Sequence, residues 1–186
     1  MAPYTSDTPF NQIASLKKGE YENCVFTNCS FAEADFSGFV FIDCVFTSCN
    51  LSLIQLNNTA LRGVRFLACK MLGVHFETTN VFGLSLSFDD CHLNHSSFHK
   101  LRLKKTKFIN CQVVDADFTD ADLSSAVFEN CNLAQAAFSR TNLEKSDFRT
   151  AYNYSIDPAL NRISKSRFSL SGLRGLLDKF DIVIEN

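Results

Sequence analysis

Large apolar residues recur at every fifth position over most of the chain. One run begins at Tyr21 and continues through Phe26 to Val81, and a second runs from Phe88 to Phe148, neither with a gap. A period of five matches neither the 3.6 residues of a helical turn nor the two-residue alternation of a strand. Each five-residue unit is therefore expected to combine a short extended piece, centred on the large residue, with a corner.

The residues around these centres support inward and outward faces. Residues two before a centre are uncharged, and residues two apart on an extended segment share a face, so both sets are expected to point inward. Glycines stand two after a centre, where a corner is expected: Gly38, Gly63, Gly73 and Gly83. Proline is absent from 19 to 150, as a coil that uses its backbone N–H groups for neighbouring strands requires.

Phenylalanines twenty residues apart indicate four units in each coil. They form two columns, one of Phe88, Phe108, Phe128 and Phe148 and one of Phe98, Phe118 and Phe138. The step from Val81 to Phe88 is seven residues instead of five, so two extra residues lie near 82–87. If they form a bulge, the columns continue at a spacing of twenty-two and take in Phe66 and Phe76.

Both ends of such a coil need caps, because they expose unpaired strands. Residues 1–18 are predicted to form the N-terminal cap, with a short turn or helix over 8–13. Residues 151–186 are predicted to form the C-terminal cap, with a helix at about 169–179 that Ser169 begins and a following strand at 182–184. This helix and strand carry more apolar residues than are needed to cover the last coil, which predicts that the protein forms a homodimer through them. The predicted interface residues are Leu170, Leu173, Leu176, Leu177, Phe180, Ile182 and Ile184.

The repeat resembles the pentapeptide repeat family, whose unit is a small residue, a polar residue, a central Leu or Phe and two polar or small residues. The segments 116–120 (ADFTD) and 121–125 (ADLSS) match that unit as they stand. The resemblance covers 19–150 and implies an all-β solenoid, a right-handed quadrilateral parallel β-helix of pentapeptide repeats with a C-terminal capping and dimerisation helix. At roughly 4.8 Å for each coil, the repeat predicts a rod on the order of 30 Å long.

Composition narrows the function classes. The chain has 186 residues, with 18 basic and 20 acidic side chains, so neither a globally basic nucleic-acid binder nor an acidic tail is indicated. No 18-residue apolar span and no signal-peptide pattern is visible, so we expect no membrane partner and a cytoplasmic location. Direct nucleic-acid binding is not expected either.

The eight cysteines all stand at inward positions, where we expect reduced, buried thiols. Six form one column at coil spacing: Cys29, Cys49, Cys69, Cys91, Cys111 and Cys131. Stacked neighbours about 4.8 Å apart do not suit a disulfide. The four histidines are all at outward positions, and no nucleophile-elbow, Walker-type or dinucleotide motif is present. We therefore expect no catalytic, cofactor or metal site.

Surface charge is uneven along the rod. A basic cluster lies at Lys100–Lys107, and an acidic set follows it: Asp115, Asp117, Asp120, Asp122 and Glu129. One interpretation is that the acidic set faces a partner and imitates the phosphates of DNA. The alternative is salt ladders between coils, since Asp120 lies between Lys100 and Arg140, Asp122 is over Arg102, and Asp115 is over His95.

A narrower resemblance concerns the quinolone-resistance (Qnr-type) pentapeptide proteins. It rests on 49–52 (CNLS), 61–64 (LRGV), Cys69-Lys70 and a Leu-rich C-terminal helix followed by an apolar strand. It implies a rod-shaped dimer that imitates DNA and acts on DNA gyrase and topoisomerase IV. This chain departs from the Qnr-type proteins in two ways. Its repeat leaves no room for projecting loops, and it has no sustained acidic face. The sequence thus predicts a non-enzymatic interaction scaffold, either a DNA mimic for a type II topoisomerase or a general interaction or structural module with another partner.

Overall fold

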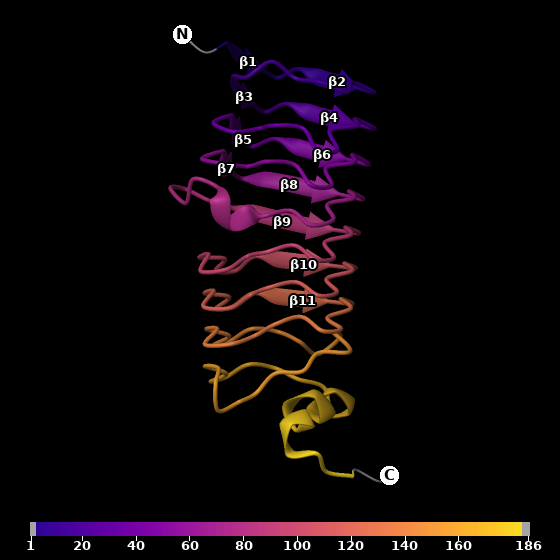
Figure 1. Ribbon diagram of the computed structural model, residues 1–186, viewed down its shortest axis with the longest axis vertical. Coiled ribbons are helices and arrows are strands. Elements are labelled where there is room, and N and C mark those ends of the chain that lie inside the picture. The colour runs from indigo at the N-terminus through magenta and orange to yellow at the C-terminus, as the bar shows by residue number, and fades with distance from the viewer. Residues whose placement is uncertain (1–2, 184–186) are drawn as a thin grey trace.

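The computed structural model describes residues 3–183 as a rod of stacked coils (Figure 1). One parallel sheet contains β1 (Tyr4–Ser6), β3 (Glu20–Glu22), β5 (Val40–Ile42) and β7 (Ala60–Arg62). A second contains, in order, β2 (Pro9–Asn11), β4 (Val25–Thr27), β6 (Val45–Thr47), β8 (Val64–Leu67), β9 (Leu86–Asp89), β10 (Lys107–Ile109) and β11 (Val127–Glu129). The all-β solenoid that the resemblance to the pentapeptide repeat family implies is confirmed.

The core is a stack of aromatic rings along the rod axis. One column contains Phe10, Phe26, Phe46, Phe66, Phe88, Phe108, Phe128, Phe148 and Phe168, whose successive ring centroids are 4.5 to 5.4 Å apart. A second column, Phe76 to Phe138, meets the first edge-on. Because the first column has eight steps of about 4.8 Å, the rod is on the order of 40 Å long, longer than 19–150 alone predicts.

The two extra residues lie in one projecting corner before β9. Ala60 bridges to Asn80 at a spacing of twenty, whereas Val64 pairs with Leu86 at twenty-two. The expected continuation of the columns is confirmed, but the inward placement of Val81 is wrong. Its side chain is 68% exposed, and Leu84 packs against the core instead. The insertion therefore moves the inward position three residues along. A short 3₁₀ helix, η1 (Phe76–Thr78), precedes the corner.

The N-terminal segment covers the first coil, and it does so with two short strands instead of the predicted short turn or helix. Strands β1 and β2 pair with β3 and β4 at a spacing of sixteen residues, four fewer than in later coils. Pro9 begins β2, which is an edge strand of its sheet, where a missing N–H breaks no ladder. Phe10 stacks on Phe26 with 4.9 Å between ring centroids, so it extends the core column.

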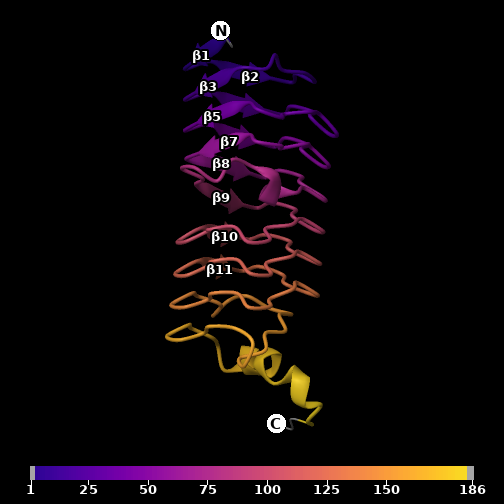
Figure 2. The same ribbon diagram turned by 60° about the vertical axis from the view of Figure 1, so that its left-hand side comes forward.

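At the other end, the coils continue past residue 150. Asp147 bridges to Arg167, and Phe168 stacks on Phe148 at 5.4 Å, so coil-like pairing extends beyond the predicted end of the repeat at 150. The segment that follows forms 3₁₀ helices η2 (Ser171–Leu176) and η3 (Asp178–Phe180) in place of the expected helix at 169–179. Figure 2 places these turns beyond the last coil, at the opposite end of the rod from the N-terminus. Residues 182–183 form no strand, and Ile184 lies outside the described residues.

Close packing on Tyr154 explains why this segment is not a regular α-helix. A Cβ atom at Gly172 would overlap the Tyr154 hydroxyl, and one at Gly175 would overlap the Tyr154 carbonyl oxygen. The Ile156 N–H donates to the Gly175 carbonyl at 2.8 Å, which fixes the turn against the last coil. Ser169, expected at the start of the helix, accepts a hydrogen bond from the Gly172 N–H at 3.1 Å. Glycine is needed at both contacts, and glycine weakens an α-helix.

Candidate partner-binding surfaces

The acidic set lies within one stretch of the chain on the outside of the rod. Of its members Asp115, Asp117, Asp120, Asp122 and Glu129, none is buried. They are distributed over successive corners and faces instead of forming a column along the axis. A partner that meets one side of the rod therefore contacts only part of the set.

Four of the five carboxylates have a basic or imidazole neighbour. Arg140 donates two hydrogen bonds to Asp120, at 2.7 and 2.9 Å, and these hold the pKa of Asp120 below its ordinary value. Asp115 lies 3.6 Å from His95 Nδ1, and Asp117 lies 3.9 Å from His99 Nδ1. Asp122 lies 3.3 Å from Lys104 Nζ.

These contacts confirm part of the expected salt ladder and correct the rest. The pairs Asp120–Arg140 and Asp115–His95 are present. Arg102 and Asp122 do pair through their backbones, but the carboxylate reaches diagonally to Lys104, which lies on the same outward face two residues along. Within residues 3–183, Glu129 alone of the set forms no ion pair. The set is therefore largely compensated by neighbouring coils.

The projecting corner is an apolar surface that sequence reasoning missed. Val81 and Phe82 are 68% and 76% exposed, and Figure 1 shows their loop reaching beyond the corners of adjacent coils. The two-residue break in the period was the available signal. That break predicts a bulge in the wall, whereas the structure turns both apolar side chains to solvent.

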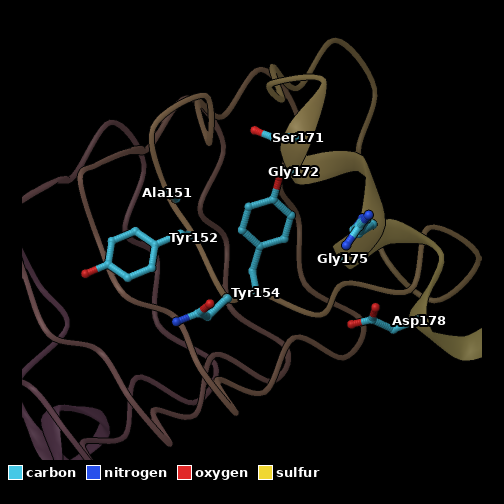
Figure 3. Close-up of a pocket in the computed structure, with 9 residues that line it drawn as sticks. Ala151, Tyr152, Tyr154, Ser171, Gly172, Gly175 and Asp178 are labelled. Atoms are coloured by element: carbon cyan, nitrogen blue, oxygen red, sulfur yellow. The ribbon is translucent and has the colours of Figure 1, made fainter. Parts of the chain in front are cut away.

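The C-terminal turns carry the predicted dimer residues, and these divide into two groups. Leu176 packs against the core and Leu177 is partly buried. The exposed group is Leu170, Leu173, Phe180 and Ile182. Beside these turns, a pocket of about 520 Å³ lies between Tyr152–Tyr154 and the 171–178 segment (Figure 3). The apolar surface is thus at the very end of the rod, where a second rod end can meet it.

The eight cysteines are free and buried, as expected. Their sulfur atoms lie 3.1 to 3.9 Å from backbone carbonyl oxygens, for example 3.3 Å from Cys44 to Tyr21. Burial raises the pKa of the Cys44 thiol to about 12, which keeps it protonated. In the part of the chain that the structure describes, no group of three His, Cys, Asp or Glu side chains is placed to hold a metal ion.

A sequence profile described as "Pentapeptide repeat region" matches residues 20–86 and 84–148. The chain belongs to the pentapeptide repeat family. No protein with a curated description matches it in sequence.

Solved structures of this family share the fold along the whole chain. Trypsin-treated QnrB1 R167E, a plasmid-mediated fluoroquinolone resistance protein, superposes with a TM-score of 0.67 at 19% identity, covering 99% of this chain and 98% of that one. Full-length QnrB1 superposes with a TM-score of 0.65 at 18% identity, covering 97% of this chain and 100% of that one.

Within residues 3–183, no helix is long and apolar enough to cross a membrane.

Proposed function

We propose that this pentapeptide repeat protein is a non-enzymatic scaffold that acts as a homodimer by surface recognition of a protein partner. The interior is filled by the aromatic columns, so a solenoid of this kind offers its surface for function. The observation that carries the proposal is the exposed apolar group on the C-terminal turns, with Leu170 at 88% and Phe180 at 56% exposure. Such groups on a soluble protein typically mark an interface.

Dimerisation is tested by light scattering on the intact protein. Leu170→Asp with Leu173→Asp places two charges on the exposed apolar group and is expected to give a monomer. The matched control is Leu53→Asp, because Leu53 is 56% exposed on a corner far from the turns. A monomeric parent contradicts the dimer, and so does an equal effect of the control.

For the partner we propose a type II topoisomerase, DNA gyrase or topoisomerase IV, with the dimer taking the place of a DNA segment. Support comes from the likeness to QnrB1, a fluoroquinolone resistance protein, which covers 97 to 99% of this chain and 98 to 100% of that one. Asp117 and Glu129 are the members of the acidic set with the weakest compensation. Because these two carboxylates lie on different faces of one coil, a partner's basic surface on one side of the rod would engage one of them, and a double variant covers both possibilities.

A supercoiling assay with a quinolone present tests this partner. Protection or inhibition at micromolar protein is expected, and Asp117→Lys with Glu129→Lys is expected to abolish it. Asp35→Lys is a matched control, because Asp35 and Asp117 each accept a backbone N–H two residues on at 2.8 Å and lie on the same face. No effect of the parent on either enzyme contradicts the topoisomerase proposal and leaves the scaffold proposal to the dimer test.

A general interaction module with another partner is the second candidate. The observation that favours it is the compensation of the acidic set, since the bidentate Arg140–Asp120 pair reduces the charge that a DNA mimic presents. This candidate gains support if the protein is dimeric and has no effect in the supercoiling assay.

A further inference from the structure

The projecting corner presents its apolar tip in a fixed conformation. The Phe82 N–H donates to the Asn80 side chain at 2.9 Å, and the Arg62 guanidinium lies 5.6 Å from the centre of the Phe82 ring. On the far side of the loop, the Ser85 N–H donates to the Leu61 carbonyl and its own carbonyl accepts from Val64, both at 3.0 Å. An exposed aromatic side chain that is held in place loses little conformational entropy when a partner covers it.

A column of lysines follows the tip along the same corner. Lys107 pairs with Ser87, so Lys105 lies one coil beyond Ser85 in register. Lys107 also pairs with Val127, which bridges to Asp147, which in turn bridges to Arg167. The residues two before each of these therefore continue the column toward the C-terminus. Its members all have the left-handed backbone of a corner, with φ between 59° and 61°: Lys105, Ser125, Lys145 and Lys165.

The acidic side chains near this column are already engaged by other cations. Glu144, next to Lys145, is paired with Arg162 at 2.7 Å. Asp147 is paired with Arg149 at 2.7 Å. Within the described residues, by contrast, the three column lysines form no ion pair. The column therefore has positive charge available to a partner.

The sign of the corner reverses on the other side of the tip. Toward the N-terminus the same corner carries Asp43 and Asp7, each with a left-handed φ of 50°. An acidic partner anchored at Phe82 is therefore attracted in one direction and repelled in the other. It must run from the tip toward Lys165.

We propose that this corner binds an extended acidic segment of a partner protein, with one apolar side chain on Val81 and Phe82 and its carboxylates along the lysine column. From Ser85 to Lys165 the column spans four coil steps, about 19 Å, which corresponds to about six residues of extended chain. The apolar tip supplies the anchor, and the lysines supply long-range attraction and direction. The surface does not depend on a topoisomerase as the partner.

A peptide fits this surface better than single-stranded nucleic acid does. Nucleic-acid grooves place several aromatic side chains along the basic track so that successive bases can stack. Here the single exposed ring has Arg62 over it, and the column contains only lysine and serine. Val81 offers no stacking surface, but it enlarges the contact for an aliphatic side chain.

The test uses a fluorescent peptide of about six glutamates with one leucine at the end, titrated with the full chain while anisotropy is followed. Binding with a Kd below about 1 mM is expected. We expect Phe82→Ser to weaken it about tenfold or more. Replacing Lys105, Lys145 and Lys165 together by Glu should abolish binding and its salt dependence. All four residues are exposed, so thermal unfolding is expected to confirm an intact fold.

Matched controls change the same chemistry elsewhere on the rod. Leu53→Ser removes another exposed apolar corner residue, and replacing Lys17, Lys18 and Lys70 by Glu gives the same change in net charge. Equal weakening by a control and its partner variant overturns the proposal, as does a peptide that fails to bind below about 1 mM. Tighter binding of a single-stranded oligonucleotide of equal charge makes nucleic acid the occupant and also overturns it. A leucine-free peptide that binds equally well excludes the apolar anchor.

Discussion

The two halves of the rod fill similar coils with different residues. From Tyr21 to Phe46 every centre is aromatic, whereas from Phe88 to Phe148 phenylalanine alternates with leucine or valine. The small inward positions also differ, since Ala116, Ala121, Ala126 and Ala136 join three cysteines in the second run, whereas the first run has five cysteines there. Both halves remain buried and in parallel register. The coil therefore requires apolar side chains at inward positions and tolerates different volumes there.

The outer surfaces of the two halves differ more than their cores. Residues 4–50 carry six acidic and two basic side chains, whereas 100–179 carry nine acidic and thirteen basic. All ion pairs within residues 3–183 involve residue 75 or a later one. Because outward positions do not affect the winding of the coil, charge can vary along the rod without altering its fold. Function is therefore expected to follow the charge pattern and the exposed apolar tips.

The core comparison is tested by Phe41→Ala and Phe108→Ala, for which we expect the largest effects. Each should lower the free energy of unfolding by about 3 to 5 kcal/mol through lost burial and a cavity. Phe41 contacts five aromatic rings and Phe108 contacts four, so the N-terminal change should cost at least as much. Denaturant unfolding followed by circular dichroism measures both. A loss under about 1 kcal/mol would show that the aromatic stack contributes little.

Gly175→Ala tests how tightly the C-terminal turns pack on the last coil. The added Cβ would overlap the Tyr154 carbonyl oxygen, so the C-terminal turns should separate from the last coil at a cost of roughly 1 to 3 kcal/mol. Hydrogen exchange of the Ile156 amide, which donates to the Gly175 carbonyl, reports the separation. Ser171→Ala is the control, because Ser171 is exposed on the same turn. Unchanged protection of Ile156 contradicts the packing argument.

The buried thiols are expected to make the free energy of unfolding depend on pH in the alkaline range. Burial raises the pKa of Cys44 to about 12, and the cysteine neighbour Cys131 helps to raise that of Cys111 to about 12. The unfolded thiol ionises near 9, so the stabilisation is complete below that pH and is lost as pH rises from 9 toward 12. We expect slow thiol labelling in the native state and a falling urea midpoint above about pH 9. Rapid labelling of three or more native thiols is incompatible with this.

The smallest effect is expected from the surface carboxylates. Hydrogen bonds from Arg149 hold the pKa of Asp147 below its ordinary 3.8, so its stabilisation is present above that value and is lost as pH falls through the lower, folded-state pKa. Asp147→Asn should cost about 0 to 1 kcal/mol near neutral pH, and less in acid. Asp43→Asn, in the half without such pairs, should change little. Urea midpoints near neutral pH and near pH 3 compare the two. A larger loss at Asp43 would reverse the comparison.

Much of the fold could be predicted because each centre is a large apolar residue at a fixed interval. The interval fails at the N-terminal end, where the first coil is four residues shorter than the later ones. Phe10 and Phe26 are sixteen residues apart, so a period of five does not connect them, although their rings stack. Phe168 does stand twenty after Phe148 and was a usable signal. The 3₁₀ turns depend on how Gly172 and Gly175 fit around Tyr154, which no local pattern encodes.

The candidate surfaces were less predictable because they depend on side-chain conformation. The register placed Asp122 over Arg102 correctly, but a long flexible lysine two residues along reaches the same carboxylate. The seven-residue step marked an insertion at 82–87 without indicating which residue would turn inward. Leu84 packs on the core and Val81 does not, an outcome that depends on the backbone path of the whole corner.

The same stack accepts steps of sixteen, twenty and twenty-two residues while its aromatic column stays continuous. The number of residues in a coil can thus change without altering the position of the next coil on the stack. Duplicating a whole coil would move every later feature along the axis by about 4.8 Å without rotating it. The rod can serve as a molecular ruler, in which gene duplication sets the distance between two recognition elements and corner insertions such as 81–84 set what is displayed at each mark.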